Sequence, residues 1–571
     1  MHFAYKTEEG NMQLRTFEQP LTVISTVKIE DVLPCLERVL AFTKDGYFAA
    51  GYVSYEASPA FDSAYAVHEK PTMPLLYFAI YESATESALQ ADGHFNVQVT
   101  SSDTTELAYA QAIETIKARI EDGITYQTNY TVRLYGEFDG DALTFFNELQ
   151  HSQQAGYTAY LQCGDTQILS ASPELFFHLK GDTLTTKPMK GTSRRGKSAD
   201  EDVALAHELY HSEKNRAENV MIVDLLRNDL GKIAVTDSVE VTKLFDVEHY
   251  PTVHQMTSTV QATLQPELNI IDVFKALFPC GSITGAPKVS TMQVIAELEA
   301  SPRDVYCGAI GFITPQQEAI FNVPIRTAVI KDNQLTYGVG GGITWDSTAR
   351  GEFDEVLAKA QVLTTKQPHF ELLESLLLED GSYFLLERHL ERLEKSACYF
   401  NFPFDKPAIR AQLEMEAQQK SGLHKVRLAL SKTGALLVES TPIQQMNDTI
   451  SVALAQTAVN SDEVFLYHKT THRPMYTVHK IPEGCFDVLL YNERSEITEF
   501  TFGNVVYEIG GQLYTPPVSS GLLAGTYRAE LLATGKIKER VLMKDELAHI
   551  DTLYFINSVR KMKKARLSFE L

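Results

Sequence analysis

A short polar stretch that contains a proline, TTKQPH at residues 364–369, divides this chain into two parts. A helical pattern ends just before it, and polar residues with proline are typical of a linker between domains. The chain has 571 residues, and a single hydrophobic core does not grow to that size. The sequence therefore predicts two domains, over residues 1–365 and 370–571.

The composition is that of a folded protein, with 44% hydrophobic and 22% charged residues. The formal net charge of -23 argues against a nucleic-acid partner, because phosphate contacts need a basic face. No apolar run approaches the roughly 18 residues that suggest a membrane helix. The N-terminal residues MHFAYKTEEGNMQ lack the basic start and apolar centre of a signal peptide. We therefore expect a cytoplasmic protein that does not bind membranes.

The six cysteines are scattered along the chain, and no two form a CxxC pair. Neither a disulfide framework nor a zinc site is expected from such spacing. Most of these side chains are predicted to be small buried hydrophobes.

Hydrophobic spacing predicts helices on both sides of the linker, at residues 107–122, 213–230, 351–363 and 385–400. In the first of them, Ile113, Ile116 and Ile120 share one stripe. Gly123 and Gly231 are placed to end the first and second helices.

Strands are predicted in residues 1–100, which read as apolar and aromatic segments separated by turns. Residues 126–138 also read as a strand, because they are rich in Thr, Tyr and Val. The run GVGGG at 338–342 is compatible with a flexible turn, or with a loop whose backbone N–H groups approach an anion.

Carboxylates in the first part form a candidate metal site. Glu352 and Glu355 are three residues apart, so they share one face of a helix, and Glu218 lies on the helix predicted before them. Mg²⁺ takes oxygen ligands and leaves positions for substrate and water. Solvated helix faces would show the same pattern, so these residues alone decide nothing.

The motifs of the first part resemble, in order and spacing, the chorismate-utilising family. That family includes the large subunits of anthranilate synthase and aminodeoxychorismate synthase, and the isochorismate and salicylate synthases. The motifs that carry the resemblance are SASPELFF, PMKGT, RAENVMIVDLLRNDLG, GSITGAPK, GAIGF, IRTAV, GVGGGITWDS and GEFDEVLAKA. The match is strong over about residues 100–365 and looser before that, through GYVSYEA. The resemblance implies an α+β fold in which antiparallel sheets form a sandwich with helices.

The resemblance also assigns roles to individual residues. It makes Glu218 and Glu355 the ligands of a Mg²⁺ ion that holds a carboxylate of chorismate. It places Arg326 and Lys359 where the family binds the substrate's carboxylates. Further substrate-binding positions are Gln127, Thr192, His254, Ser282, Tyr306, Gly340 and Gly342, where the glycines supply backbone N–H groups and His254 also fits a structural role in the core.

Two positions distinguish the reactions of this family. Gln127 stands where members that add water carry a lysine, which argues against isochorismate or salicylate synthesis. Lys190 stands where anthranilate synthases typically have alanine and aminodeoxychorismate synthases have lysine. By this resemblance Lys190 attacks C2 of chorismate so that ammonia enters at C4, and Glu174 protonates the departing hydroxyl. The bound metal and Arg326 are expected to lower the pKa of Lys190.

The source of ammonia is expected to be a separate glutamine amidotransferase subunit. No GxCxG motif of a glutaminase nucleophile occurs in the sequence. Cys163 and Cys280 lack the residues that flank such a nucleophile.

The second part resembles the class IV aminotransferases, a fold-type IV family dependent on pyridoxal 5'-phosphate (PLP) that includes aminodeoxychorismate lyase. The resemblance rests on the segments ELLESLL, LLERHLERLEKSA, YHKTTHRPMY, ITEFTFGNVVY and TPPVSSGLLAGTYR. It makes Lys469 the lysine that binds PLP covalently, and Glu499 the partner of the pyridine nitrogen. Arg392 and Thr526 are expected to bind the cofactor phosphate.

Together these resemblances imply an enzyme of p-aminobenzoate and folate biosynthesis. The first domain would convert chorismate to aminodeoxychorismate, and the second would release pyruvate from that product. The alternatives are an anthranilate synthase large subunit, a chorismate sensor without turnover, and a C-terminal aminotransferase of branched-chain or D-amino acids. A homodimer through the C-terminal domain is compatible with its family, whereas channelling and tryptophan binding stay open.

Overall fold

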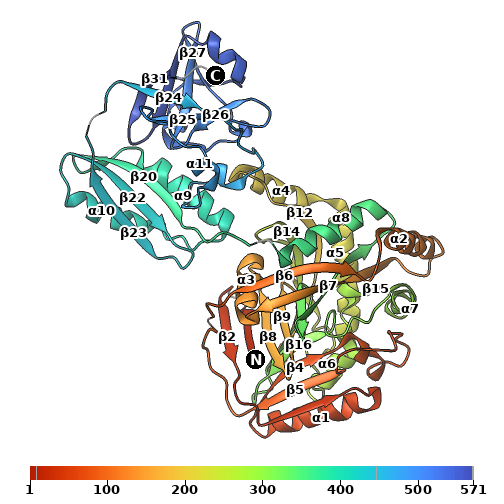
Figure 1. Ribbon diagram of the computed structural model, residues 1–571. Helices are drawn as coiled ribbons and strands as arrows, with labels where there is room; N and C mark the ends of the chain where they lie inside the picture. The colour runs from red at the N-terminus through yellow and green to blue at the C-terminus, as the bar shows by residue number, and fades with distance from the viewer. Residues whose placement is uncertain (8–9, 90, 365, 445, 569–571) are drawn as a thin grey trace. The chain divides into compact units, whose positions relative to one another are not determined.

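The computed structural model describes residues 1–7, 10–89, 91–364, 366–444 and 446–568 (Figure 1). By internal packing the chain divides into two compact units, Met1–Arg194 with Ala206–Gln367, and Arg195–Leu205 with Pro368–Leu571. Of the predicted linker, residue 365 lies outside the described residues. Within these ranges, no helix is both long enough and apolar enough to span a membrane.

The first unit is built on two large antiparallel sheets, as far as its described residues show. In the first sheet the strand order is β15-β7-β19-β18-β9-β8-β1-β2, and β6 also pairs with β7. Its strands are β1 (His2–Lys6), β2 (Met12–Thr16), β6 (Phe95–Ser102), β7 (Gln127–Gly140), β8 (Tyr157–Cys163), β9 (Thr166–Ser172), β15 (Gly285–Ala286), β18 (Thr327–Lys331) and β19 (Gln334–Ile343). The strand predicted over 126–138 is confirmed as β7.

In the second sheet the order is β12-β14-β11-β10-β17-β16-β4-β5-β3, and β13 pairs with β14. Its strands are β3 (Thr22–Thr26), β4 (Phe48–Val53), β5 (Leu76–Tyr81), β10 (Leu175–Lys180), β11 (Thr183–Lys187), β12 (Met189–Arg194), β13 (Glu240–His249), β14 (Val253–Thr263), β16 (Ala309–Ile313) and β17 (Ala319–Asn322). One core cluster joins Phe3 and Ile168 of the first sheet to Tyr52 and Phe312 of the second. The sheets therefore pack face to face as a sandwich.

The helices predicted in this unit are confirmed as α2 (Glu106–Glu121), α5 (Glu213–Gly231) and α8 (Ala349–Ala360). Each begins after a side chain that accepts a backbone hydrogen bond, namely Thr105, Ser212 and Thr348. Gly231 lies in the last turn of α5 rather than after it. The other helices before the linker are α1 (Ile29–Lys44), α3 (Ala142–Gln153), α4 (Ala199–His211), α6 (Ile270–Leu277) and α7 (Lys288–Leu298).

Two sequence-based predictions need correction. Residues 1–100 are not only strands and turns, because α1 buries a helical stripe that includes Val32, Leu36 and Val39. The GVGGG run is neither a turn nor a loop, since it lies within β19 and pairs with β7. Glycine is needed there for close packing: a Cβ on Gly340 would come within 2.2 Å of the carbonyl oxygen of Tyr130.

The second unit has a small sheet and a closed barrel. The small sheet has the order β21-β20-β22-β23. In the other sheet β26 pairs with both β25 and β27, which closes the strands into a barrel. The strands of this unit are β20 (Leu372–Glu379), β21 (Ser382–Tyr383), β22 (Leu423–Leu430), β23 (Leu436–Pro442), β24 (Thr449–Leu454), β25 (Asp487–Tyr491), β26 (Ile497–Phe500), β27 (Gly503–Ile509), β28 (Gln512–Thr515), β29 (Lys538–Glu539), β30 (Thr552–Asn557) and β31 (Lys561–Leu567).

The amphipathic helix predicted at 385–400 is confirmed as α9 (Leu386–Phe400). It packs on the small sheet through Leu390, Leu393 and Ala397, which are buried in one core cluster with Leu376 and Val426. The other α-helices that follow the linker, among the described residues, are α10 (Lys406–Gln418), α11 (Pro474–Thr477) and α12 (Thr526–Ala533).

Candidate active sites

Lys190 lies on β12 and meets Gln127 of β7 beside the glycines of β19. A methyl group on Gly342 would come within 2.4 Å of both Lys190 Nζ and Gln127 Nε2. Gln127 is fully buried, and neither of its side-chain polar atoms has a hydrogen-bond partner among the described residues. A buried amide without a partner is unfavourable unless a ligand satisfies it. This corner of the first unit is therefore a candidate binding site.

Glu174 follows β9 and is buried in the same site. Ser282, in the short turn Gly281–Ile283, donates a hydrogen bond from Oγ to Glu174 Oε1 at 2.5 Å. Burial raises the pKa of Glu174 to about 7, although Ser282 and Lys190 each oppose the shift. A carboxyl with this pKa holds a proton near neutral pH and can donate it.

The charges around Lys190 set its protonation. Withdrawal from solvent lowers the pKa of Lys190, and Lys359 lowers it further. Glu218, Glu174 and Glu355 act in the opposite direction. Lys359 is thus one cation that lowers the pKa of Lys190, and the effect expected of Arg326 and a bound metal stays a prediction.

The predicted metal ligands lie on α5 and α8. On α8, Glu352 Oε2 and Glu355 Oε1 lie 3.3 and 3.7 Å from the point where a Cβ on Gly341 would stand. Burial raises the pKa of Glu352, and the neighbouring charge of Glu355 raises it further. Carboxylates held side by side in this way fit a hard divalent cation. Sequence reasoning placed Glu352 on this helix face but did not assign it to the site.

Backbone groups of the glycine-rich strand β19 face the charged side chains of α8. Lys359 donates from Nζ to the carbonyl oxygen of Gly340 at 2.8 Å and also pairs with Glu355 at 2.7 Å. Because a residue's N–H and C=O point to the same edge of a strand, the N–H of Gly340 faces this edge too. The direction of the backbone N–H repeats at every second residue of a strand, so the N–H of Gly342 faces this edge as well. The predicted role of Gly340 and Gly342 in binding an anion stays a prediction.

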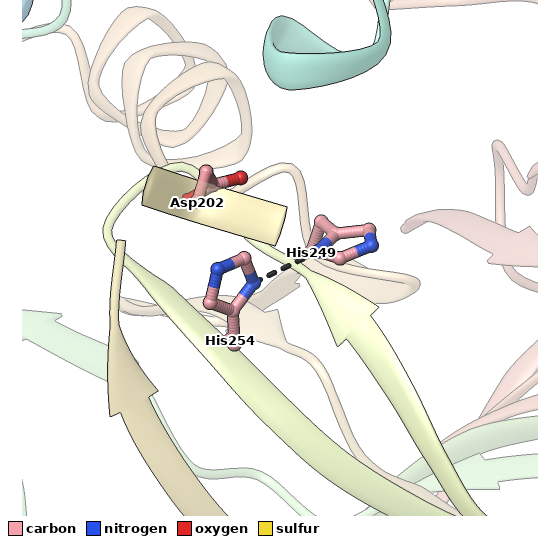
Figure 2. Close-up of side chains that lie close together, drawn as sticks. All are labelled: Asp202, His249 and His254. Atoms are coloured by element: carbon pink, nitrogen blue, oxygen red, sulfur yellow. Dashed lines mark hydrogen bonds between the residues drawn. The ribbon is translucent and has the colours of Figure 1, made fainter. Parts of the chain in front are cut away.

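Three other residues that were predicted to bind substrate, Arg326, Tyr306 and His254, each contact a different neighbouring residue. Arg326 has a left-handed backbone, with φ of 51°, and donates from Nη1 to Gln153 Oε1 at 2.6 Å. The Tyr306 ring lies against Gly338, where a Cβ would come within 2.4 Å of it. His254 is buried on β14, and its Nδ1 lies 2.8 Å from His249 Nδ1 (Figure 2).

Thr192 lies on β12, two residues after Lys190. It donates from Oγ1 to Gln255 Oε1 at 3.1 Å, and Gln255 donates to the carbonyl oxygen of Gly191. Asn219, beside Glu218, donates to the carbonyl oxygen of Lys190 at 3.2 Å. Asn219 was not assigned from sequence, and these contacts hold the part of β12 that carries Lys190.

The second unit contains a cavity of about 360 Å³. Its lining includes all of the residues predicted to bind PLP, which are Arg392, Lys469, Glu499 and Thr526. These residues come from separate parts of the unit, so the fold has brought them together. At Gly525 a Cβ would come within 1.9 Å of Asn504 Oδ1, so a larger residue there would force Asn504 to move.

Glu499 is held at the base of this cavity by three donors. Tyr476 donates from its hydroxyl at 2.7 Å, and Asn504 and the backbone of Leu523 donate at 3.1 and 3.2 Å. Burial raises the pKa of Glu499 to about 8. Burial also lowers the pKa of Lys469 to about 8, with Arg392 acting in the same direction. Glu499 is thus suited to pair with the ring nitrogen of a pyridine cofactor, and Lys469 is suited to attack the carbonyl carbon of that cofactor.

Arg392 and Thr526 form the end of the cavity suited to phosphate. Arg392 donates to both carboxylate oxygens of Glu374, at 2.8 and 2.6 Å. The ring of His389 bridges Glu374 and Thr526, at 2.6 and 3.2 Å. Thr526 also begins α12, whose free backbone N–H groups favour an anion. Glu374 and His389 were not assigned from sequence, although His389 and Arg392 both lie in the segment LLERHLERLEKSA.

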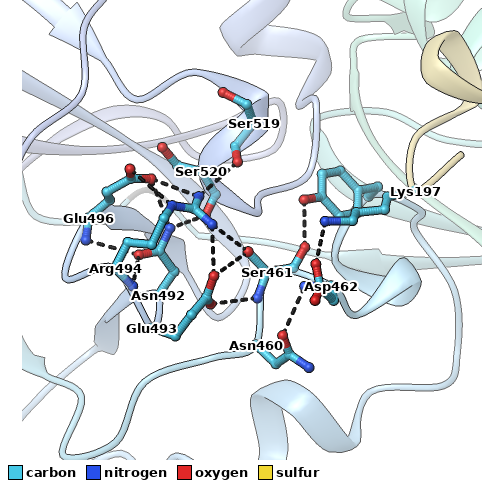
Figure 3. Close-up of polar contacts among 11 residues, drawn as sticks. Lys197, Asn460, Ser461, Asp462, Asn492, Glu493, Arg494, Glu496, Ser519 and Ser520 are labelled. Carbon is cyan, nitrogen blue, oxygen red and sulfur yellow. Dashed lines mark hydrogen bonds and ion pairs between the residues drawn. The ribbon is translucent and has the colours of Figure 1, made fainter. Parts of the chain in front are cut away.

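A polar network around Arg494 joins the segments that contain Ser461 and Ser519 (Figure 3). Arg494 donates to Ser461 Oγ at 2.8 Å and to the carbonyl oxygen of Ser519 at 3.0 Å. Ser461 also donates to Glu493 at 2.6 Å. The network therefore links the segment before Lys469 to the segment before Leu523 and Thr526.

More than half of the chain, residues 3–365, matches the family model described as chorismate binding enzyme. The chain belongs to the chorismate-binding enzyme family. Residues 371–566 match the family model of amino-transferase class IV. The chorismate-binding part is followed by the class IV part in the predicted order.

Two curated relatives of the chorismate-binding part are named aminodeoxychorismate synthase component 1. The one from Salmonella typhimurium strain LT2 is 40% identical over 258 residues, which are 45% of this chain and 57% of that protein. The one from Bacillus subtilis strain 168 is 41% identical over 256 residues, which are 45% of this chain and 54% of that protein. The chain thus spans little more than half the length of these relatives.

The crystal structure of anthranilate synthase component I from Streptococcus pneumoniae TIGR4 is also similar. It is 27% identical, with a TM-score of 0.54, and the match covers 62% of this chain and 92% of that chain. The predicted fold class is confirmed: a chorismate-utilising fold of antiparallel sheets with helices is joined to a class IV aminotransferase fold.

Proposed function

We propose that the chorismate-binding domain aminates chorismate at C4, and that the class IV domain removes pyruvate from the product to give p-aminobenzoate. The observation that carries this proposal is the meeting of Lys190, Gln127 and Glu174 in one buried site. The relatives named aminodeoxychorismate synthase component 1 support it. We further propose that a separate glutamine amidotransferase subunit supplies the ammonia.

In the first reaction Lys190 is the nucleophile and Glu174 the acid. Lys190 Nζ forms a bond to C2, the ring double bonds shift, and the C4 hydroxyl leaves as water with the proton of Glu174. Ammonia then adds at C4, and the reverse shift expels Lys190 from C2. Glu218 and Glu355 would hold Mg²⁺, which when bound supplies positive charge for a chorismate carboxylate. Lys359 and the N–H groups of β19 favour the substrate's anionic groups.

In the second reaction Lys469 moves the proton. A proton leaves C4 of aminodeoxychorismate, the C3–O bond breaks, and the enolpyruvate takes up a proton as pyruvate while the ring becomes aromatic. Arg392 and Thr526 would hold PLP, which when bound supplies the electron sink for such a reaction. Glu499, which accepts hydrogen bonds from Tyr476 and Asn504, would pair with the pyridine nitrogen of bound PLP and keep that nitrogen protonated.

A second candidate for the class IV domain is amino-acid transamination, since residues 371–566 match a model described as an aminotransferase. Lys469, Glu499, Arg392 and Thr526 serve either reaction. The fusion favours the lyase, because the lyase substrate is the product proposed for the first domain.

Product analysis tests the whole proposal. With chorismate, ammonia and Mg²⁺ but without PLP, we expect aminodeoxychorismate to accumulate. Addition of PLP should convert it to p-aminobenzoate and equimolar pyruvate, measured by chromatography. Anthranilate as the main product would refute amination at C4, and transfer of an amino group to a keto acid without pyruvate release would favour the aminotransferase.

The pKa of Glu174 predicts a pH limit on the amination step. Because burial raises this pKa to about 7, the acid is protonated below that pH and loses its proton above it. We expect kcat/KM for chorismate to fall as the pH rises through about 7, at a constant concentration of free ammonia. Glu174→Gln should lose about 10²- to 10⁴-fold in rate and no longer show this limb. A descending limb that persists in Glu174→Gln would assign it to another group.

A further inference from the structure

The class IV cavity has more positive charge than PLP requires. The basic residues in its lining are Arg392, Lys425, Lys469, Arg473 and Arg560, whereas Glu499 is the carboxylate that the described lining contains. The proposed function assigns Arg392 to the cofactor phosphate and Lys469 to its carbonyl carbon. Lys425, Arg473 and Arg560 are left without a role. Cations gathered in a cavity of an acidic protein indicate an anionic ligand besides the cofactor.

Arg560 is the best placed of these cations. It follows β30, where its backbone N–H donates to Asn557 Oδ1 at 2.7 Å. Its Nη1 donates to the carbonyl oxygen of Gln444 at 2.9 Å, and this bond orients the guanidinium group. The other N–H groups of the guanidinium can then donate to a ligand. Lys425 reaches the cavity from β22. Among the described residues, neither side chain forms an ion pair with a carboxylate.

Arg473 differs because its guanidinium group already has partners. It donates to the carbonyl oxygen of Thr501 and lies 4.4 Å from the centre of the Tyr476 ring. It also contributes to the electrostatics of both Lys469 and Glu499. Arg473 therefore lies near Lys469 and Glu499. Lys425 and Arg560 are left to bind parts of the substrate that lie farther from Lys469.

Aromatic side chains form another wall of the cavity. Phe486 and Phe502 both line it, with ring centres 5.2 Å apart in an edge-to-face arrangement. Phe502 is 41% exposed, which leaves an apolar ring available for contact. A flat six-membered ring would pack against this wall, whereas a short aliphatic side chain would cover little of it.

We propose that Arg560 and Lys425 each bind one carboxylate, so that the cavity selects a six-membered ring compound with two carboxylate groups. The inference rests on the proposed lyase function and defines the substrate class of that site. An amino acid with one carboxylate would leave one of the two cations unpaired, which disfavours it.

Kinetics with aminodeoxychorismate test the roles of the two cations. In Arg560→Gln and in Lys425→Met we expect KM to rise about 10- to 100-fold, the effect of losing one charge-assisted hydrogen bond. The kcat value should change much less, and Arg560→Lys should recover part of the loss. Lys564→Met, on β31 and outside the lining, is the matched control and should behave as the unaltered protein. Unchanged KM in both Arg560→Gln and Lys425→Met would overturn the proposal.

A binding measurement separates this inference from the lyase assignment. Isophthalate, a flat dicarboxylate, and benzoate are titrated into the PLP-loaded protein, and the absorbance of bound PLP reports binding in this cavity alone. We expect isophthalate to bind at least about tenfold more tightly than benzoate, and Arg560→Gln to lose that preference. Equal affinities would refute a dicarboxylate site. Absence of pyruvate release in the unaltered protein would instead refute the lyase function and leave the preference for isophthalate standing.

Discussion

Replacement of Lys469 by alanine should stop p-aminobenzoate formation and cause aminodeoxychorismate to accumulate. Lys469 is the lysine that lines the class IV cavity with its pKa lowered to about 8, so it is the group able to bind PLP covalently and to move the proton. We expect lyase activity to fall on the order of 10³-fold or more, the scale seen when a covalent catalytic group is removed. The rate of amination by the first domain should stay unchanged, because its reacting groups belong to the other compact unit.

Three measurements check this prediction. Borohydride reduction should trap PLP on Lys469 in the unaltered protein and trap none in Lys469→Ala. Chromatography follows aminodeoxychorismate and p-aminobenzoate, with contaminating lyase excluded. Lys480→Ala, which removes an exposed lysine of the same unit, should retain both the trap and the activity. An unchanged rate of p-aminobenzoate formation in Lys469→Ala would sink the lyase assignment.

Replacement of Lys190 by alanine should abolish amination at C4 while chorismate still binds within about tenfold of its normal affinity. The variant loses the nucleophile, on the same order of 10³-fold or more in rate, but keeps Lys359, Glu218 and Glu355 to bind the substrate and its metal. Alanine is also the residue typical of the anthranilate synthases at this position. The products should therefore be examined for anthranilate as well as for aminodeoxychorismate.

The control for this variant is Lys180→Ala, which removes an exposed lysine at the end of β10. It should aminate chorismate at the normal rate. Chorismate affinity is measured by equilibrium binding with Mg²⁺ present, so that lost binding and lost chemistry are distinguished. Formation of aminodeoxychorismate at an undiminished rate by Lys190→Ala would show that another group attacks the ring.

Local patterns in the sequence predicted much of the fold. Amphipathic spacing located α2, α5, α8 and α9, because one side of each helix packs on a core. The strand β7 was recognised by its β-branched and aromatic residues. The same rules missed α1 among the strands of the N-terminal region. They also interpreted the GVGGG segment of β19 as a turn or a loop, because glycine favours turns locally, whereas its role in close strand packing is visible only in three dimensions.

The sequence by itself determined which residues are candidates for chemistry, through ordered motifs on each side of the linker. Only the tertiary structure decided how they act together. Lys190 and Gln127 are far apart in sequence, and they meet because β7, β12 and β19 bring them to one corner. The pKa values of Glu174 and Lys469 shift because folding removes them from water. Nor could spacing reveal that Arg195–Leu205 packs with the second unit, or that Arg560 lines the class IV cavity. Burial and long-range proximity depend on the packed chain, whereas motifs and periodicity depend only on the order of residues.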